Sequence, residues 1–183
     1  MAAVDTSTTG TYTVKGTDAD GTHEVTATIK VANVNCVKNP SFEDADVSMW
    51  NVTYEGSNPT DIQNKSEDAM SGVNAFHFFS DSQDVVFQVE QTLTGIPAGT
   101  YAATTNIQGG DVGDNAEVKF YVIVGDQTYE SKPLALDGWV YWKSPTLTDI
   151  GVDGSTDVVL GVSVSCAKNG WGTIDDFNFY SMH

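Results

Sequence analysis

The chain has 183 residues, of which 25 are acidic and only 8 are lysine or arginine, so its formal net charge at pH 7 is -17. This charge excludes nucleic acids and anionic membrane surfaces as partners, because both are bound through basic patches. Hydrophobic residues make up 40% of the chain, enough for one well-packed domain and a small appendage. No apolar run approaches the roughly 20 residues needed to cross a membrane.

The first predicted element is a β-hairpin. Apolar and polar residues alternate over residues 11–16 and 24–31, and the Asp- and Gly-rich stretch 18–21 predicts the turn between them. With Val4-Asp5-Thr6, this segment resembles the C-terminal half of a bacterial immunoglobulin-like repeat. Residues 1–34 are too few to bury a core of their own. We therefore expect 1–34 to be a partial repeat or linker hairpin and 35–183 to be the main domain.

The main domain is predicted to be all-β. Period-two segments recur along it with turn signals every 8–15 residues, and only the stretch 66–71 could form a helical turn. This spacing favours an antiparallel β-sandwich of the jelly-roll, galactose-binding-like type. The predicted strands cover residues 75–79, 85–93, 99–108, 116–124, 128–130, 158–165 and 173–180.

Several motifs in series resemble a known family. They include Asn-Pro-Ser-Phe-Glu-Asp at 39–44, Gln-Gly-Gly-Asp at 108–111, Asp-Gly-Trp-Val-Tyr-Trp at 137–142 and Trp-Gly-Thr-Ile-Asp-Asp-Phe at 171–177. In this order they are similar to carbohydrate-binding module family 61, the galactan-binding modules attached to family 53 endo-β-1,4-galactanases. The resemblance covers about residues 35–181. It implies a non-catalytic, secreted or cell-surface bacterial module that binds β-1,4-galactan and carries a catalytic domain in cis.

Three acidic residues at the two ends of this domain are candidate metal ligands. A carboxylate beside an apolar core costs several kcal/mol unless it is paired or binds a cation, and basic partners are scarce here. In related modules such acids hold a structural calcium ion, which implies Glu43, Asp175 and Asp176 as ligands. Strand alternation places Asp175 on the same side as Phe177 and Phe179. The alternative is that the acids are solvated or cap turns.

Aromatic and polar residues form the candidate sugar site. An indole offers a flat surface to the C–H face of galactose at low entropic cost, although burial is the usual fate of any single aromatic side chain. We expect the first platforms to be Trp171 and Trp139, followed by Trp50. Amides, acids and imidazole can fix hydroxyl positions. The polar candidates are His77, Gln108, Asn106, Asp111 and Gln91.

Catalysis has little support in the sequence. There is no Gly-x-Ser-x-Gly elbow, His-Glu-x-x-His zinc motif or phosphate loop, and 2 cysteines and 3 histidines are too few for a nucleophile constellation. We therefore expect a binding module rather than an enzyme, and a monomer. The alternative is a structural or adhesive domain of a surface protein. Cys36 and Cys166 could form one disulfide or remain free thiols; the spacing does not decide.

Overall fold

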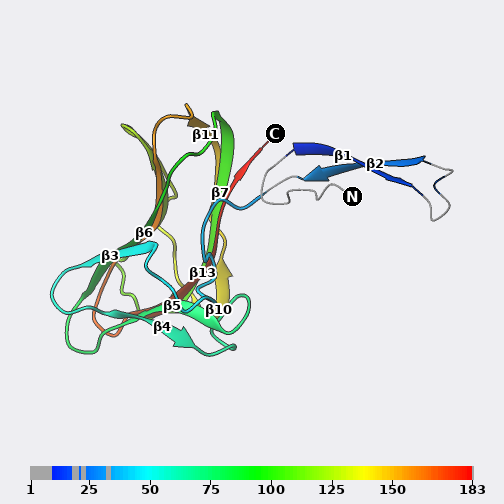
Figure 1. The fold of residues 1–183 in the computed structure, drawn as a ribbon. Coiled ribbons are helices and arrows are strands. Elements are labelled where there is room, and N and C mark those ends of the chain that lie inside the picture. Colours follow the sequence, from blue (N-terminus) through cyan, green and yellow to red (C-terminus); the bar gives the residue numbers. More distant parts are fainter. Residues whose placement is uncertain (1–9, 18–20, 22–23, 32–33, 183) are drawn as a thin grey trace.

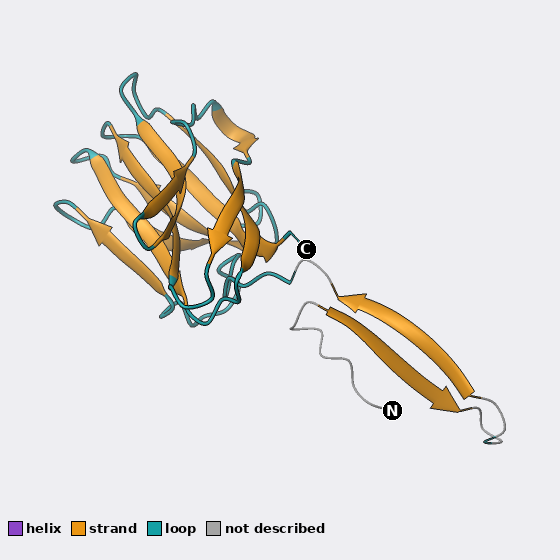
Figure 2. Ribbon diagram, turned by 90° about the horizontal axis from the view of Figure 1, so that it is seen from above, coloured by secondary structure: helices purple, strands orange, loops and turns teal. Residues whose placement is uncertain are grey.

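The computed structural model describes residues 10–17, 21, 24–31 and 34–182. These residues form strands and loops without any helix, so none of them lies in a helix that could cross a membrane (Figure 1). Two antiparallel sheets face each other, which confirms the predicted all-β sandwich (Figure 2). The stretch 66–71 contains turns and bends instead of a helical turn.

One sheet of the sandwich has six strands. Its order is β10-β7-β13-β5-β4, and β11 also pairs with β7. The bounds are β4 Thr60–Asn64, β5 Asn74–Phe79, β7 Gly99–Gly110, β10 Gly138–Lys143, β11 Thr146–Val152 and β13 Trp171–Ser181.

The second sheet has five strands in the order β3-β6-β12-β8-β9. Its bounds are β3 Trp50–Tyr54, β6 Val85–Leu93, β8 Glu117–Val124, β9 Gln127–Glu130 and β12 Val158–Cys166. Strand β6 shows the period-two burial of a half-buried strand, with Val85, Phe87 and Val89 almost fully enclosed. Phe78 and Ile174 of the opposite sheet complete the same core.

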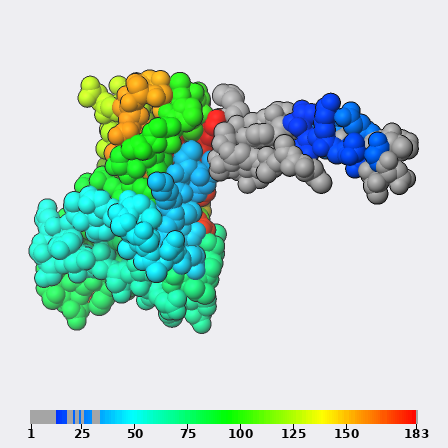
Figure 3. All heavy atoms as spheres, in the orientation of Figure 1, coloured from blue at the N-terminus to red at the C-terminus, as the bar shows by residue number. Residues whose placement is uncertain are grey.

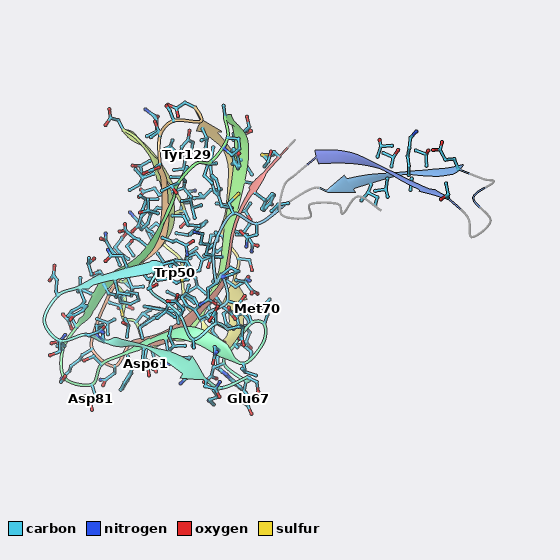
Figure 4. All side chains as sticks on the ribbon, in the orientation of Figure 1. Trp50, Asp61, Glu67, Met70, Asp81 and Tyr129 are labelled. Atoms are coloured by element: carbon cyan, nitrogen blue, oxygen red, sulfur yellow. The ribbon has the colours of Figure 1, made fainter. Side chains whose placement is uncertain are left out.

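Trp50 belongs to this core, so the prediction that it binds ligand is wrong. Its side chain is only 8% exposed, and its ring centroid lies 4.7 Å from that of Phe177 and 5.0 Å from that of Phe42. The indole N–H donates to the carbonyl of Asn39 at 3.2 Å. Figure 4 labels Trp50 on the first residue of β3, within the sandwich.

Gln91 is likewise buried, at 2% exposure, and is not available to a ligand. Its amide accepts a hydrogen bond from the backbone N–H of Lys38 and donates one to the carbonyl of the same residue, both at 2.8 Å. A buried amide with both partners supplied is stabilising. Gln91 therefore fastens the segment before β3 to strand β6.

A bulge in β13 overturns the predicted direction of Asp175. The register with β7 shifts between Asp175 and Asn178, and Asp176 has a φ of +52°. An extra residue reverses the alternation beyond it. Phe177 therefore enters the core, while Asp175 lies on the outer face of the sheet with Thr173 and Trp171, two and four residues before it in the strand.

The hairpin is confirmed as β1 (Gly10–Thr17) paired with β2 (Glu24–Val31). It forms a two-stranded sheet of its own outside the sandwich (Figure 3). Val4-Asp5-Thr6 lie outside the described residues, and the immunoglobulin-like resemblance and the boundary near residue 35 stay predictions. The sandwich begins where the N–H of Cys36 donates to the carbonyl of Phe179 at 2.8 Å.

Both cysteines are free. Cys166 is buried, and burial, helped by the charge of Asp84, raises the pKa of its thiol to about 11. The thiol is therefore an unreactive apolar group of the core at neutral pH.

Candidate sugar-binding face

The outer face of the six-stranded sheet carries two of the predicted polar residues, His77 and Gln108, in a row that also contains Asp61 and Thr173. The register pairs Asp61 with His77, His77 with Thr173, and Thr173 with Gln108, so the row crosses β4, β5, β13 and β7. Residues directly opposite each other on one face of a sheet have neighbouring side chains. Four segments far apart in the sequence therefore form one surface.

The adjacent row contains Trp171. It is paired with Phe79 of β5 on one side and with Gly110 of β7 on the other. The missing side chain of Gly110 lets the indole lie against the sheet, because a Cβ there would stand 3.2 Å from the ring. The indole N–H donates to Asp111 Oδ2 at 3.0 Å. Phe79 is 43% exposed and extends the apolar surface next to the indole.

Trp139 lies at the edge of the same sheet, on β10. Its side chain is 51% exposed, and its indole N–H donates to Asp68 Oδ1 at 2.8 Å. Val140 has a φ of +60°, which is rare for a β-branched residue, and Trp139, Val140 and Tyr141 are all exposed, so β10 does not show the burial of a regular strand. Only β7 separates β10 from β13, so the strands that carry the two tryptophans run about 10 Å apart in the sheet.

His77 is held by a carboxylate. Its Nδ1 lies 2.6 Å from Asp61 Oδ1, and the His77 side chain is partly exposed. A proton on Nδ1 that is donated to Asp61 leaves Nε2 as a hydrogen-bond acceptor. His77 can therefore receive a hydrogen bond from a sugar hydroxyl.

Gln108 is fully buried, and the structure assigns it a supporting position instead of the predicted ligand contact. Its Nε2 donates to the carbonyl of Asp68 at 3.2 Å and to Thr173 Oγ1 at 3.1 Å, and its Oε1 accepts from the N–H of Val140 at 2.5 Å. Every polar group of this amide therefore contacts protein. Its position in the sequence, beside two glycines, gave no sign that segment 65–73 covers it.

Asn106 lies beside the bulge of β13. Its Oδ1 accepts a hydrogen bond from Ser144 Oγ at 2.6 Å, and its Nδ2 lies 3.5 Å from Asp176 Oδ2. The side chain is partly buried. Asn106 thus shares the outer face with the indoles, but its acceptor is already occupied by protein.

The three predicted metal ligands accept hydrogen bonds instead of facing one another. Glu43 Oε1 accepts from the N–H groups of Val73 and Asn74, at 2.8 and 2.7 Å. Asp175 Oδ2 accepts from those of Met70 and Ser71, at 2.7 and 3.1 Å. Asp176 Oδ1 accepts from the hydroxyls of Ser41 and Ser71, at 2.8 and 2.6 Å.

These carboxylates do not form a cation shell as they lie. Among the described residues, no three acidic, His or Cys side chains gather in a way that could hold a metal ion. A hard cation needs several oxygen ligands directed at one point, and it would have to displace these donors. Burial, assisted by the charge of Asp176, raises the pKa of Asp175 to about 7, although three backbone N–H groups oppose this shift. The calcium ion stays a prediction from the sequence.

A cavity lies on the other sheet. This trough of about 480 Å³ opens on the outer face of the five-stranded sheet and is lined by Thr53, Tyr54, Gln88, Ser163 and Lys119, among other residues. It contains none of the four tryptophans. We place the candidate site on the opposite sheet, because a sugar needs exposed flat surfaces as well as volume.

Sequence reasoning did not name as candidates four residues that belong to the outer face of the six-stranded sheet or contact its tryptophans: Asp61, Thr173, Phe79 and Asp68. Phe79 stands two residues after His77 in β5, so alternation alone could have placed it on the same face. Asp68 could not have been found in this way, because its contact with Thr173 joins residues 105 positions apart.

No protein-family model and no curated protein matches the chain. Among solved structures, it is similar to TmCBM61 in complex with β-1,4-galactotriose, with a TM-score of 0.72 and 27% identity over 80% of this chain and 98% of that chain. A carbohydrate-binding module from the β-sandwich superfamily has a TM-score of 0.57 and 20% identity, covering 94% of this chain and 74% of that chain. The xylan-binding CBM22-1 domain of Paenibacillus barcinonensis Xyn10C has a TM-score of 0.53 and 16% identity, covering 81% and 95%. The last two show the fold alone.

The fold is therefore that of the β-sandwich carbohydrate-binding modules, such as TmCBM61, which are non-catalytic. Within this class, the resemblance to family 61 that the sequence indicated is confirmed by the structure.

Proposed function

We propose that this module binds β-1,4-galactan on the outer face of the six-stranded sheet and holds an attached galactanase on pectic polysaccharide. The observation that carries the proposal is the pair of tryptophans on one face, each with its indole N–H bound to an aspartate. The complex of TmCBM61 with galactotriose supports the same class of ligand.

The chemistry of the face suits galactose. The axial 4-hydroxyl of galactose leaves a continuous patch of C–H groups on one side of the sugar ring, and this patch packs well on an indole. A 1,4-linked galactan is curved, so two platforms on different strands suit it better than one flat surface. The polar row beside them supplies His77 as an acceptor, and Asp61 as a further carboxylate with an exposed side chain.

The biological role follows from tethering. A module that binds the polymer raises the concentration of substrate around a catalytic domain in the same chain. We propose a secreted or cell-surface bacterial protein whose module acts as a monomer. The shallow site should give a dissociation constant on the order of 10–100 μM, because only a few contacts are available.

Isothermal titration with galactotriose tests the proposal directly. Trp171→Ala and Trp139→Ala should each weaken binding more than tenfold while leaving the melting temperature nearly unchanged, since both side chains are partly or largely exposed. Tyr54→Ala is the matched control, because Tyr54 is an exposed aromatic residue that lines the trough on the other sheet.

Four results would argue against the proposal. Unchanged affinity in both tryptophan variants would show that galactotriose does not bind at these tryptophans. A loss of affinity in Tyr54→Ala alone would indicate that it binds in the trough on the other sheet. Failure of the wild type to bind any galactan would favour the structural or adhesive alternative. Release of reducing ends from galactan by the purified chain would indicate an enzyme.

A further inference from the structure

The segment between β4 and β5, residues 65–73, reaches the indole of Trp139. The contact is the hydrogen bond from the indole N–H to Asp68 Oδ1, at 2.8 Å. The two residues are 71 positions apart. Figure 4 labels Met70, which belongs to this segment.

Asp68 is itself held firmly. Its side chain is 14% exposed, and its Oδ2 accepts a hydrogen bond from Lys65 Nζ at 2.6 Å. Its backbone N–H donates to the carbonyl of Lys65 at 2.9 Å. Its own carbonyl accepts from Thr173 Oγ1 at 2.8 Å and from Gln108 Nε2 at 3.2 Å. Both carboxylate oxygens and both backbone groups of Asp68 therefore have partners.

Gln108 connects Asp68 to the backbone of β10. The same buried amide that donates to the carbonyl of Asp68 accepts the N–H of Val140, the residue next to Trp139. Val140 occupies a backbone region that a β-branched residue adopts only when its surroundings enforce it. The ring and the backbone of Trp139 are thus fixed through one network, with Asp68 at its centre.

We propose that Asp68 is a positioning residue, which holds the indole plane of Trp139 in the orientation that receives a sugar ring. The proposal rests on the proposed function, because the benefit appears as affinity for a glycan. A half-exposed side chain that is fixed in advance loses less conformational freedom when the ligand binds. Asp68 acts through Trp139, and each of its carboxylate oxygens already accepts a hydrogen bond from the protein.

A double-mutant cycle with Asp68→Ala and Trp139→Phe tests this role. Phenylalanine keeps an aromatic ring but cannot donate to Asp68, so Asp68→Ala should weaken galactotriose binding about five- to tenfold in the wild type and have no further effect in the Trp139→Phe background. Asp68→Asn should retain most of the affinity, since its amide oxygen still accepts from the indole. Titration calorimetry gives all the dissociation constants.

A spectroscopic measurement without ligand separates this proposal from the proposed function. The protein is labelled with 5-fluorotryptophan, and the ¹⁹F resonance of Trp139 is assigned by its loss in Trp139→Phe. Asp68→Ala should shift or broaden that resonance alone, while the signals of Trp50, Trp142 and Trp171 stay in place. Asp81→Ala is the control, because Asp81 is an exposed aspartate on a different loop.

Two outcomes would overturn the positioning role. One is an unchanged Trp139 resonance in Asp68→Ala; the other is an equal loss of affinity from Asp68→Ala with and without the indole. If the wild type binds no galactotriose, a Trp139 resonance that moves in Asp68→Ala and is restored in Asp68→Asn still supports the positioning role, while the proposed ligand is rejected.

Discussion

The indole of Trp171 lies against the backbone of Gly110, and a Cβ atom at that glycine would stand 3.2 Å from Cζ2 of the ring. Asp111, the next residue, accepts the indole N–H at 3.0 Å. One dipeptide at the end of β7 therefore sets both how close the ring lies to the sheet and how it is turned.

Gly110→Ala should weaken galactotriose binding severalfold, because the new methyl group pushes the ring outward by a few tenths of an ångström. Stability should change little, since the ring can move towards solvent. Calorimetric titration measures the effect. Gly151→Ala is the matched control in β11, where a Cβ meets nothing nearer than the Tyr129 hydroxyl at 3.9 Å. Equal affinities for both variants and the wild type would contradict this account.

His77→Ala should weaken binding about tenfold, which corresponds to about 1.4 kcal/mol, the loss of one well-placed hydrogen bond. The reason is that Asp61 fixes the ring with Nε2 as an acceptor. Asp61→Asn keeps an acceptor oxygen for Nδ1 and should have a smaller effect. Titration of both variants with galactotriose is the measurement. A larger loss from Asp61→Asn than from His77→Ala would indicate that Asp61 contacts the sugar itself.

Trp50→Ala should destabilise the fold by about 3–5 kcal/mol, the range for removing a large aromatic side chain from a core. Trp50 packs against Phe42 and Phe177, and no part of its role depends on a ligand. Urea denaturation measures the loss, and Trp171→Ala serves as the comparison. If Trp50→Ala were as stable as Trp171→Ala, the burial of Trp50 would be wrong.

The calcium prediction can be tested by thermal melting. An ion that binds only the folded chain raises the melting temperature by mass action, so calcium should raise it and EDTA should lower it. Glu43→Gln should abolish the response. A melting temperature that responds to neither addition would contradict the prediction, and would leave the amides of Val73 and Asn74 as the sufficient partners of Glu43.

Alkaline pH should destabilise the fold partly through Tyr121. Its hydroxyl, in a side chain that is 7% exposed, donates to Glu90 Oε1 at 2.5 Å. Burial and this carboxylate raise the pKa of Tyr121 above its ordinary value of about 10. Above pH 10 the native state therefore keeps a proton that the unfolded chain loses, so the free energy of unfolding falls as pH rises.

In Tyr121→Phe, the free energy of unfolding should fall less steeply with rising pH than in the wild type. Tyr141→Phe, at an exposed position, should leave the slope unchanged. Urea unfolding between pH 9 and about pH 11.5 measures the slopes. Parallel slopes for the wild type and Tyr121→Phe would show that Tyr121 does not contribute.

The strands that follow a simple period were predictable. Strand β6 alternates along its whole length, so hydrophobicity alone indicates both its type and its buried face. Strand β4, Thr60–Asn64, is nearly all polar because it lies at the sheet edge, and the Val140 backbone interrupts β10. Neither strand has the alternation that would have identified it, and both were missed, as were β3 and β11.

The candidate site was predictable only in part. Trp171 and Trp139 lie on the proposed face, but nothing near Trp50 in the sequence distinguishes it from them. Its burial depends on Phe177, 127 positions away in the chain. The bulge at Asp176 reverses one face of β13, and such an inserted residue leaves no mark in an alternating pattern.

The backbone hydrogen bond between Cys36 and Phe179 determines where other domains can be joined to the sandwich. The polypeptide enters the sandwich beside the end of β13, whereas Trp171 opens that strand about 30 Å away along its axis. A domain fused ahead of Asn35 is therefore attached near the C-terminal end of β13, whereas Trp171 lies at the N-terminal end of that strand. A domain joined there is therefore separated from the two indoles by most of the length of β13.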